Sequence, residues 1–141
     1  MKAEIRSRPI GATVLAIVLG WLGVAGLLNA VGWPLLRISP LFKSAPRDFV
    51  ENFPPVLGSL QLSLFALAYG VSALVAARAV WRMSASAATL YGVWVAIVLA
   101  SGLWFVVRVP GASSSSMVPL LATAAVILAA GWLFIRRLVQ Q

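Results

Sequence analysis

The chain of 141 residues contains no cysteine and no histidine, and it has only three acidic residues. Without cysteine there is no disulfide, no thiolate nucleophile and no cysteine-based metal site. Without histidine, haem ligation by imidazole, the usual zinc sites and histidine proton relays are excluded. We therefore expect no cofactor and no metal ion, and the lack of catalytic side chains predicts a protein that is not an enzyme.

Charge of either sign is scarce, and long hydrophobic runs take its place. Charged residues make up 10% of the chain and hydrophobic residues 62%, whereas an average globular domain has about 25% charged residues. Hydrophobic stretches lie near residues 10–33, 56–80, 89–107 and 118–136, and a helix needs about 20 apolar residues to cross a bilayer. The sequence predicts an all-α integral membrane protein with one domain of four transmembrane helices. Short connections favour an up-down-up-down bundle.

The net charge of +8 comes from basic residues near the expected helix ends, where lipid headgroups attract them. A nucleic-acid partner is therefore not expected. Seven basic residues lie in the two tails and the middle turn, and four lie in the other two connections. The positive-inside rule then places both termini in the cytoplasm, most simply of a bacterial inner membrane. The first hydrophobic run exceeds the roughly 7–15 residues of a signal peptide's hydrophobic region, so we expect a retained first span.

Ionisable residues are missing from the middle of every predicted span. Proton-coupled transport and hydrolysis inside the membrane usually need such residues, so both are disfavoured. The polar candidates that remain are Asn29 and Gln61, at comparable depths in the first and second spans. Antiparallel neighbours can bring the two amides together, which predicts a polar contact between the helices. Contact with a ligand or an ion is the alternative.

Small residues form a stripe along each of the first two spans, and such stripes let helix backbones approach closely in lipid. We predict a packing seam at Gly20, Gly23, Gly26, Ala66 and Gly70. The sequence leaves open whether the seam lies within one chain or between chains.

The connection at residues 34–55 is the only sizeable segment outside the predicted spans, and it should contain a short interfacial helix. Phe49 and Phe53 share one side of such a helix, Arg47 and Glu51 share another, and Asp48 suits its N-terminal turn. The helix is expected either to cover the mouth of the bundle or to form an outer docking surface for a partner.

The function that these features favour is that of an accessory or stabilising subunit of a larger inner-membrane complex. Such a subunit acts through helix–helix contacts with other membrane proteins or with copies of itself in the lipid bilayer. Two alternatives remain open: an immunity-type inhibitor of a membrane-active toxin, and a homo-oligomeric channel or transporter lined by Asn29 and Gln61.

Overall fold

The computed structural model describes residues 9–44, 56–108 and 117–140, and the fold of these residues is entirely helical. The long helices are α1 (Ile10–Ile38), α4 (Val56–Trp81), α5 (Ala87–Arg108) and α6 (Met117–Gln140), and the short helix α2 (Pro40–Lys43) follows α1. All four long helices are long and apolar enough to cross a membrane. The prediction of an all-α chain with four membrane-length helices is therefore confirmed for these residues.

Helix α1 is longer than the sequence analysis predicted. Its expected end was Trp33, but the helix continues through Pro34 to Ile38. A proline inside a helix removes one backbone N–H donor, and here the apolar pattern carries on beyond it. The apolar part of α1, Ile10–Leu36, has 27 residues. At about 1.5 Å per residue it is about 40 Å long, so it exceeds a hydrocarbon core of about 30 Å and must tilt or project from it.

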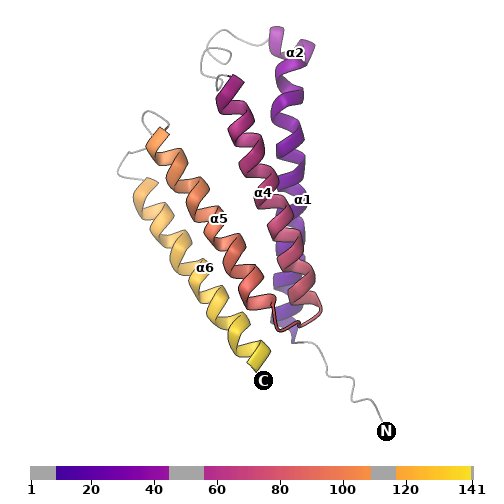
Figure 1. Ribbon diagram of the computed structural model, residues 1–141, viewed down its shortest axis with the longest axis vertical. Coiled ribbons are helices and arrows are strands. Elements are labelled where there is room, and N and C mark those ends of the chain that lie inside the picture. The colour runs from indigo at the N-terminus through magenta and orange to yellow at the C-terminus, as the bar shows by residue number, and fades with distance from the viewer. Residues whose placement is uncertain (1–8, 45–55, 109–116, 141) are drawn as a thin grey trace.

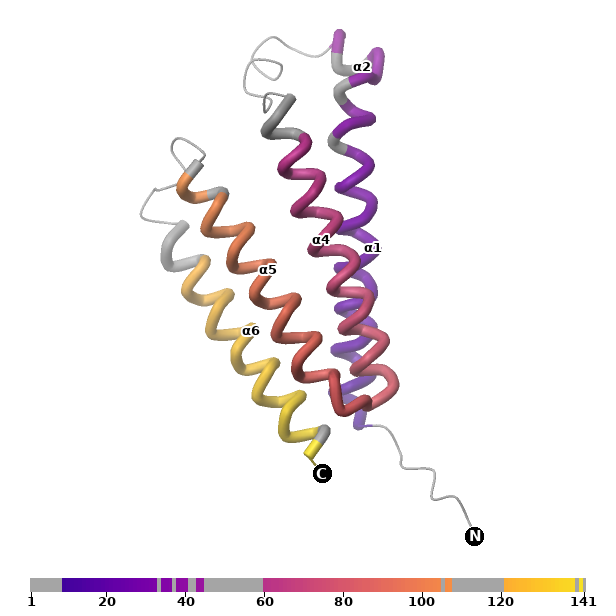
Figure 2. Tube along the Cα trace, viewed as in Figure 1, coloured from indigo at the N-terminus to yellow at the C-terminus, as the bar shows by residue number. Residues whose placement is uncertain are grey.

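The long helices lie side by side in chain order, and successive helices run in opposite directions in the view of Figure 1. Helix α4 packs mainly on α1, α5 packs on α4, and α6 packs on α5. The start of α1, the turn between α4 and α5, and the end of α6 lie at one end of the molecule, which we call the basal end (Figure 2). The end that carries α2 is the distal end.

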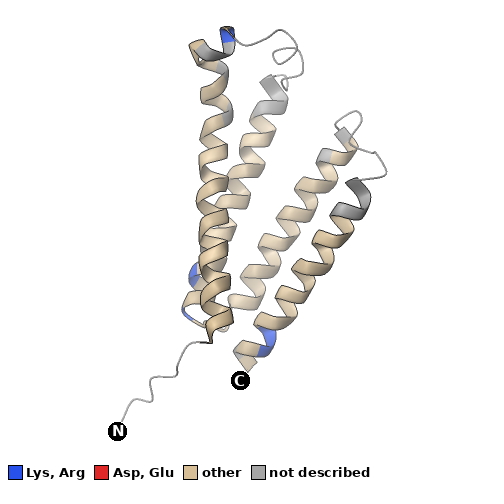
Figure 3. Ribbon diagram, turned by 180° about the vertical axis from the view of Figure 1, so that it is seen from behind, with Lys and Arg blue, Asp and Glu red and all other residues tan. Residues whose placement is uncertain are grey.

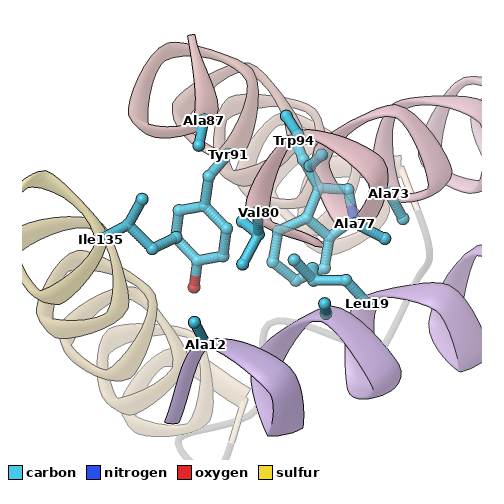
Figure 4. Packing of buried hydrophobic residues seen from close by; sticks show 12 residues of the cluster. Ala12, Leu19, Ala73, Ala77, Val80, Ala87, Tyr91, Trp94 and Ile135 are labelled. Carbon is cyan, nitrogen blue, oxygen red and sulfur yellow. The ribbon is translucent and has the colours of Figure 1, made fainter. Parts of the chain in front are cut away.

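The hydrophobic core is concentrated at the basal end, where residues from all four long helices meet (Figure 4). Its buried members are Ala12, Ala16, Leu19, Ala73, Ala76, Ala77, Ala79, Val80, Ala87, Tyr91, Trp94 and Ile135. Toward the distal end the ribbons of the α1–α4 pair and the α5–α6 pair diverge (Figure 1). The rings of Phe65 and Trp104, with centroids 5.3 Å apart, still join α4 to α5 there. The buried residues are thus concentrated at one end of the arrangement.

A tight turn joins α4 to α5 at the basal end. The backbone N–H of Ser84 donates to the carbonyl of Ala79, and that of Met83 donates to the carbonyl of Val80, both at 3.0 Å. This pair of bonds is the Schellman pattern that ends many helices, and it places the residue after the helix in the left-handed region. Met83 has a φ of 51°, and its half-buried side chain packs against the core. That packing offsets the strain of a non-glycine residue at this position.

The predicted outer docking residues, Arg47, Asp48, Phe49, Glu51 and Phe53, lie outside the described residues. Their role and the interfacial helix therefore stay predictions. Within the described part of this connection, α2 forms a single turn directly after α1.

Candidate functional site

The closest approach of backbones is between α1 and α4, at three buried glycines of the predicted seam. A Cβ atom placed on Gly70 would lie 2.8 Å from the amide nitrogen of Leu27 and 2.9 Å from the carbonyl oxygen of Gly23. A Cβ on Gly26 would lie 2.8 Å from the Cα of Gly70. These neighbours are backbone atoms, which cannot rotate away as a side chain does. The close contact between the two helices therefore requires glycine, which has no side chain, at these positions.

The other two residues of the predicted seam do not share this close contact. A Cβ on Gly20 would meet no atom within 4 Å, and both Gly20 and Ala66 are only half-buried. The seam therefore includes Gly23, Gly26 and Gly70, and it joins two helices of the same chain. Toward the basal end, buried alanines such as Ala16 and Ala73 continue the contact.

Glycines also mark the contacts of α6. The hydroxyl of Tyr91 on α5 lies directly against Gly131 on α6. Nearer the distal end, a Cβ on Gly102 would lie 2.7 Å from Leu121 Cδ2, so α5 and α6 stay close along most of their length. At the basal end, a Cβ on Gly11 would lie 2.8 Å from the ring of Phe134, which brings α1 and α6 together there.

An aromatic cluster fills the space between the helices near the basal end. The ring of Trp94 lies 5.8 Å from that of Tyr69 and 5.4 Å from that of Tyr91. Trp94 is only 4% exposed, whereas Trp21 on α1 is 74% exposed, so these two tryptophans have opposite environments. The indole Nε1 of Trp94 is buried without a hydrogen-bond partner.

The two amides that the sequence analysis singled out are both exposed. Asn29 lies on α1 and Gln61 on α4, helices that do pack on each other. Neither amide is enclosed in that contact, so direct pairing between them stays a prediction. Their exposure instead leaves both side chains accessible from outside the described helices.

A groove between α5 and α6 opens at the basal end, and the sequence analysis did not identify it. Its volume is about 470 Å³, and its lining residues are Ala85, Ala88, Thr89, Gly92, Trp132, Arg136 and Gln140. The guanidinium carbon of Arg136 lies 5.4 Å from the centre of the Trp132 ring, within cation–π range. The spacing of these two residues on α6, i and i+4, places them on one side of the helix. The contact between Trp132 and Arg136, though not the groove itself, could have been predicted from that spacing in the sequence.

A second, smaller groove lies at the same end between α1 and α4. It has a volume of about 320 Å³ and is lined by Ala16, Ile17, Ala77, Arg78 and Trp81. It again combines an arginine and a tryptophan with small apolar residues, but it lacks the hydroxyl and amide groups of the α5–α6 groove.

The charges of the described residues lie at the helix ends. Arg37, Lys43 and Arg108 are at the distal end by their positions in the chain, and Arg78, Arg82, Arg136 and Arg137 are at the basal end (Figure 3). All three acidic residues of the chain lie outside the described ranges. Within those ranges, no group of histidine, cysteine or acidic side chains could hold a metal ion.

Comparison of the chain with protein-family models, with curated proteins and with solved structures finds no match.

Proposed function

We propose that this chain is a non-catalytic accessory subunit of a larger complex in a bacterial inner membrane, and that it works through helix–helix contact. The observation that carries the proposal is the exposure of Asn29 and Gln61. Each amide continues a helix side that packs inside the protein nearer the basal end.

Asn29 follows Leu15 and Leu22 at seven-residue intervals, so the three side chains lie on one side of α1. Leu15 and Leu22 pack against the core, but Asn29 is exposed. Asn29 also lies one helical turn before Trp33, and tryptophan is enriched at the edges of a bilayer. The core-facing side of α1 therefore ends in a polar group within the membrane region.

Gln61 has a similar place on α4. It lies four residues before Phe65, hence on the same side of the helix, and the ring of Phe65 contacts Trp104 on α5. Gln61 itself is exposed. The side of α4 that faces α5 thus also ends in an accessible amide toward the distal end.

An amide without partners in an apolar environment costs about 1–3 kcal/mol by protein mutational data. Amide side chains in membranes are usually satisfied across helix–helix contacts. A transmembrane helix of a partner, lying against the distal parts of α1 and α4, would cover the end of the protein that has few buried core residues. It would also offer hydrogen-bond partners to the exposed amides of Asn29 and Gln61.

The proposal includes an up-down-up-down crossing of the membrane with the basal end in the cytoplasm. Its support is the alternating course of the helices in Figure 1 and the four arginines at the basal end. Positive charge next to a span is retained on the cytoplasmic side.

Site-directed photocrosslinking in native membranes tests the partner. A benzophenone amino acid replaces Asn29 in one variant and Val31 in another. Val31 is 58% exposed and, two residues further on, points to nearly the opposite side of α1. We expect one discrete protein crosslink from position 29 and only lipid adducts from position 31.

Two further measurements separate this role from the alternatives. Asn29→Leu should abolish co-purification with the crosslinked protein, while Val31→Leu should retain it. Equal crosslinking from both positions, or a protein always recovered alone, would contradict the proposal. Solute or ion flux through liposomes that contain only this chain would favour a channel or transporter instead.

A further inference from the structure

The α5–α6 groove carries an inference that is independent of the proposed partner. We infer that this groove binds the headgroup of an anionic phospholipid from the leaflet at the basal end. Its depth, its charge and its shape each support this occupant.

The depth of the groove is that of lipid headgroups. The apolar stretch of α5 begins at Ala87, and that of α6 ends at Leu138. The groove is lined by residues between 85 and 92, in the turn before α5 and its first turns, and by residues between 132 and 140 of α6, so it lies where both helices leave the hydrocarbon region. Trp132 fits that level, because an indole ring prefers the membrane interface.

The polar groups of the groove suit a phosphate. Arg136 supplies a guanidinium, which recognises phosphate oxygens with paired N–H donors. Thr89 adds a hydroxyl and Gln140 an amide. Ala88 and Thr89 also belong to the first turn of α5, where backbone N–H groups have no partners within the helix and the helix dipole favours an anion. Arg137 adds positive charge nearby, and the described residues include no acid to compete for Arg136.

The rest of the lining suits the glycerol and the upper acyl chain of a lipid. Ala85, Ala88 and Gly92 form an apolar wall without large side chains, and Trp132 closes the opposite wall. A Cβ on Gly92 would lie 3.5 Å from the Trp132 Nε1, an ordinary contact distance, whereas a longer side chain would extend into the groove. The volume of about 470 Å³ is within the usual range for small-molecule sites, about 300–1,000 Å³.

Native mass spectrometry of the full chain in detergent tests the inference, with short-chain phosphatidylglycerol as the anionic probe and phosphatidylcholine as the zwitterionic one. We expect the parent protein to retain phosphatidylglycerol in preference to phosphatidylcholine. Arg136→Gln should weaken that retention about tenfold, because it removes a charged hydrogen-bond donor. Arg137→Gln is the matched control: it removes the same charge one residue away, at a side chain that does not line the groove. It should change retention less than about threefold, since a charge outside the groove attracts the headgroup only through salt-screened electrostatics.

Gly92→Leu provides a second test that leaves every charge in place. It should lower retention of phosphatidylglycerol by filling the groove, while Gly92→Ala should have little effect. Circular dichroism and gel filtration check that the variants fold. If Arg136→Gln does not fold, Arg136→Lys takes its place: it keeps the positive charge but not the paired N–H donors, so it should bind phosphatidylglycerol more weakly than the parent protein.

Three results would overturn the inference. One is an equal loss in Arg136→Gln and Arg137→Gln, which would indicate general attraction to charge. Another is unchanged retention in Gly92→Leu. The third is equal binding of soluble glycerol phosphate, which would identify the occupant as a soluble anion instead of a lipid.

Discussion

Replacing Gly70 by alanine is expected to separate α1 from α4. The new Cβ would lie within 3 Å of two backbone atoms of α1, at Leu27 and Gly23. Backbone atoms cannot yield without moving the helix, so the substitution has the character of overpacking, which typically costs about 1–3 kcal/mol. Alanine also recovers helix propensity worth at most about 1 kcal/mol over glycine. Because the contact is backbone against backbone, we expect the clash to dominate, with a net loss of about 1–2 kcal/mol.

Gly20→Ala is the matched control. It belongs to the same predicted seam but lies on α1, and its new Cβ would meet no atom within 4 Å. It should leave stability unchanged or raise it by up to about 1 kcal/mol through helix propensity. Reversible unfolding in mixed micelles measures both free energies. Spin labels on the two helices, attached at cysteines introduced into this cysteine-free chain, measure whether the helices move apart. Equal stability and equal interhelical distances in the two variants would refute the close backbone contact.

Two further predictions concern the contacts of α5. Gly131→Ala should destabilise the α5–α6 pair by about 1–3 kcal/mol, because the new methyl group collides with the hydroxyl of Tyr91; Tyr91→Phe in the same chain should recover part of the loss, and no recovery would argue against this collision. Trp94→Phe should stay within about 1 kcal/mol of the parent, because losing a buried N–H without a partner offsets part of the lost ring contact. Trp94→Ala should cost about 3–5 kcal/mol; thermal unfolding that ranks the two variants equally would contradict this.

The helices themselves could be predicted from the sequence because a bilayer imposes both their length and their composition. Runs of about 20 apolar residues have no other common explanation. The end of α1 was less predictable. A proline usually marks a boundary, but Pro34 lies within α1, where the following residues, Leu35 and Leu36, keep the apolar pattern.

The packing of the helices could be predicted only in part. The stripe of small residues suggested a contact between the first two helices, and three of its glycines lie at the closest approach of α1 and α4. The stripe could not distinguish Gly20, because a glycine in open space and a glycine in contact look the same in a sequence. The amides of Asn29 and Gln61 show a second difficulty. Their depths suggested a pair, but pairing also depends on rotation about each helix axis, and both side chains are exposed.

The basal groove could not be foreseen because it depends on how two helix ends come together. Trp132 and Arg136 are adjacent on α6 by their spacing, and their contact could be inferred from that alone. Thr89 is distant from them in the sequence and joins them only because α5 begins where α6 ends.

The most direct test of the account is the accessibility of single cysteines in intact cells, since the chain has none of its own. Ser44→Cys places a thiol at the distal end, and Ser86→Cys places one in the basal turn. A membrane-impermeant maleimide added outside should label position 44 in intact cells and position 86 only after the membrane is opened. Labelling of both positions from the same side would mean that α4 does not cross the bilayer, and it would contradict the four-span arrangement on which the proposed contacts depend.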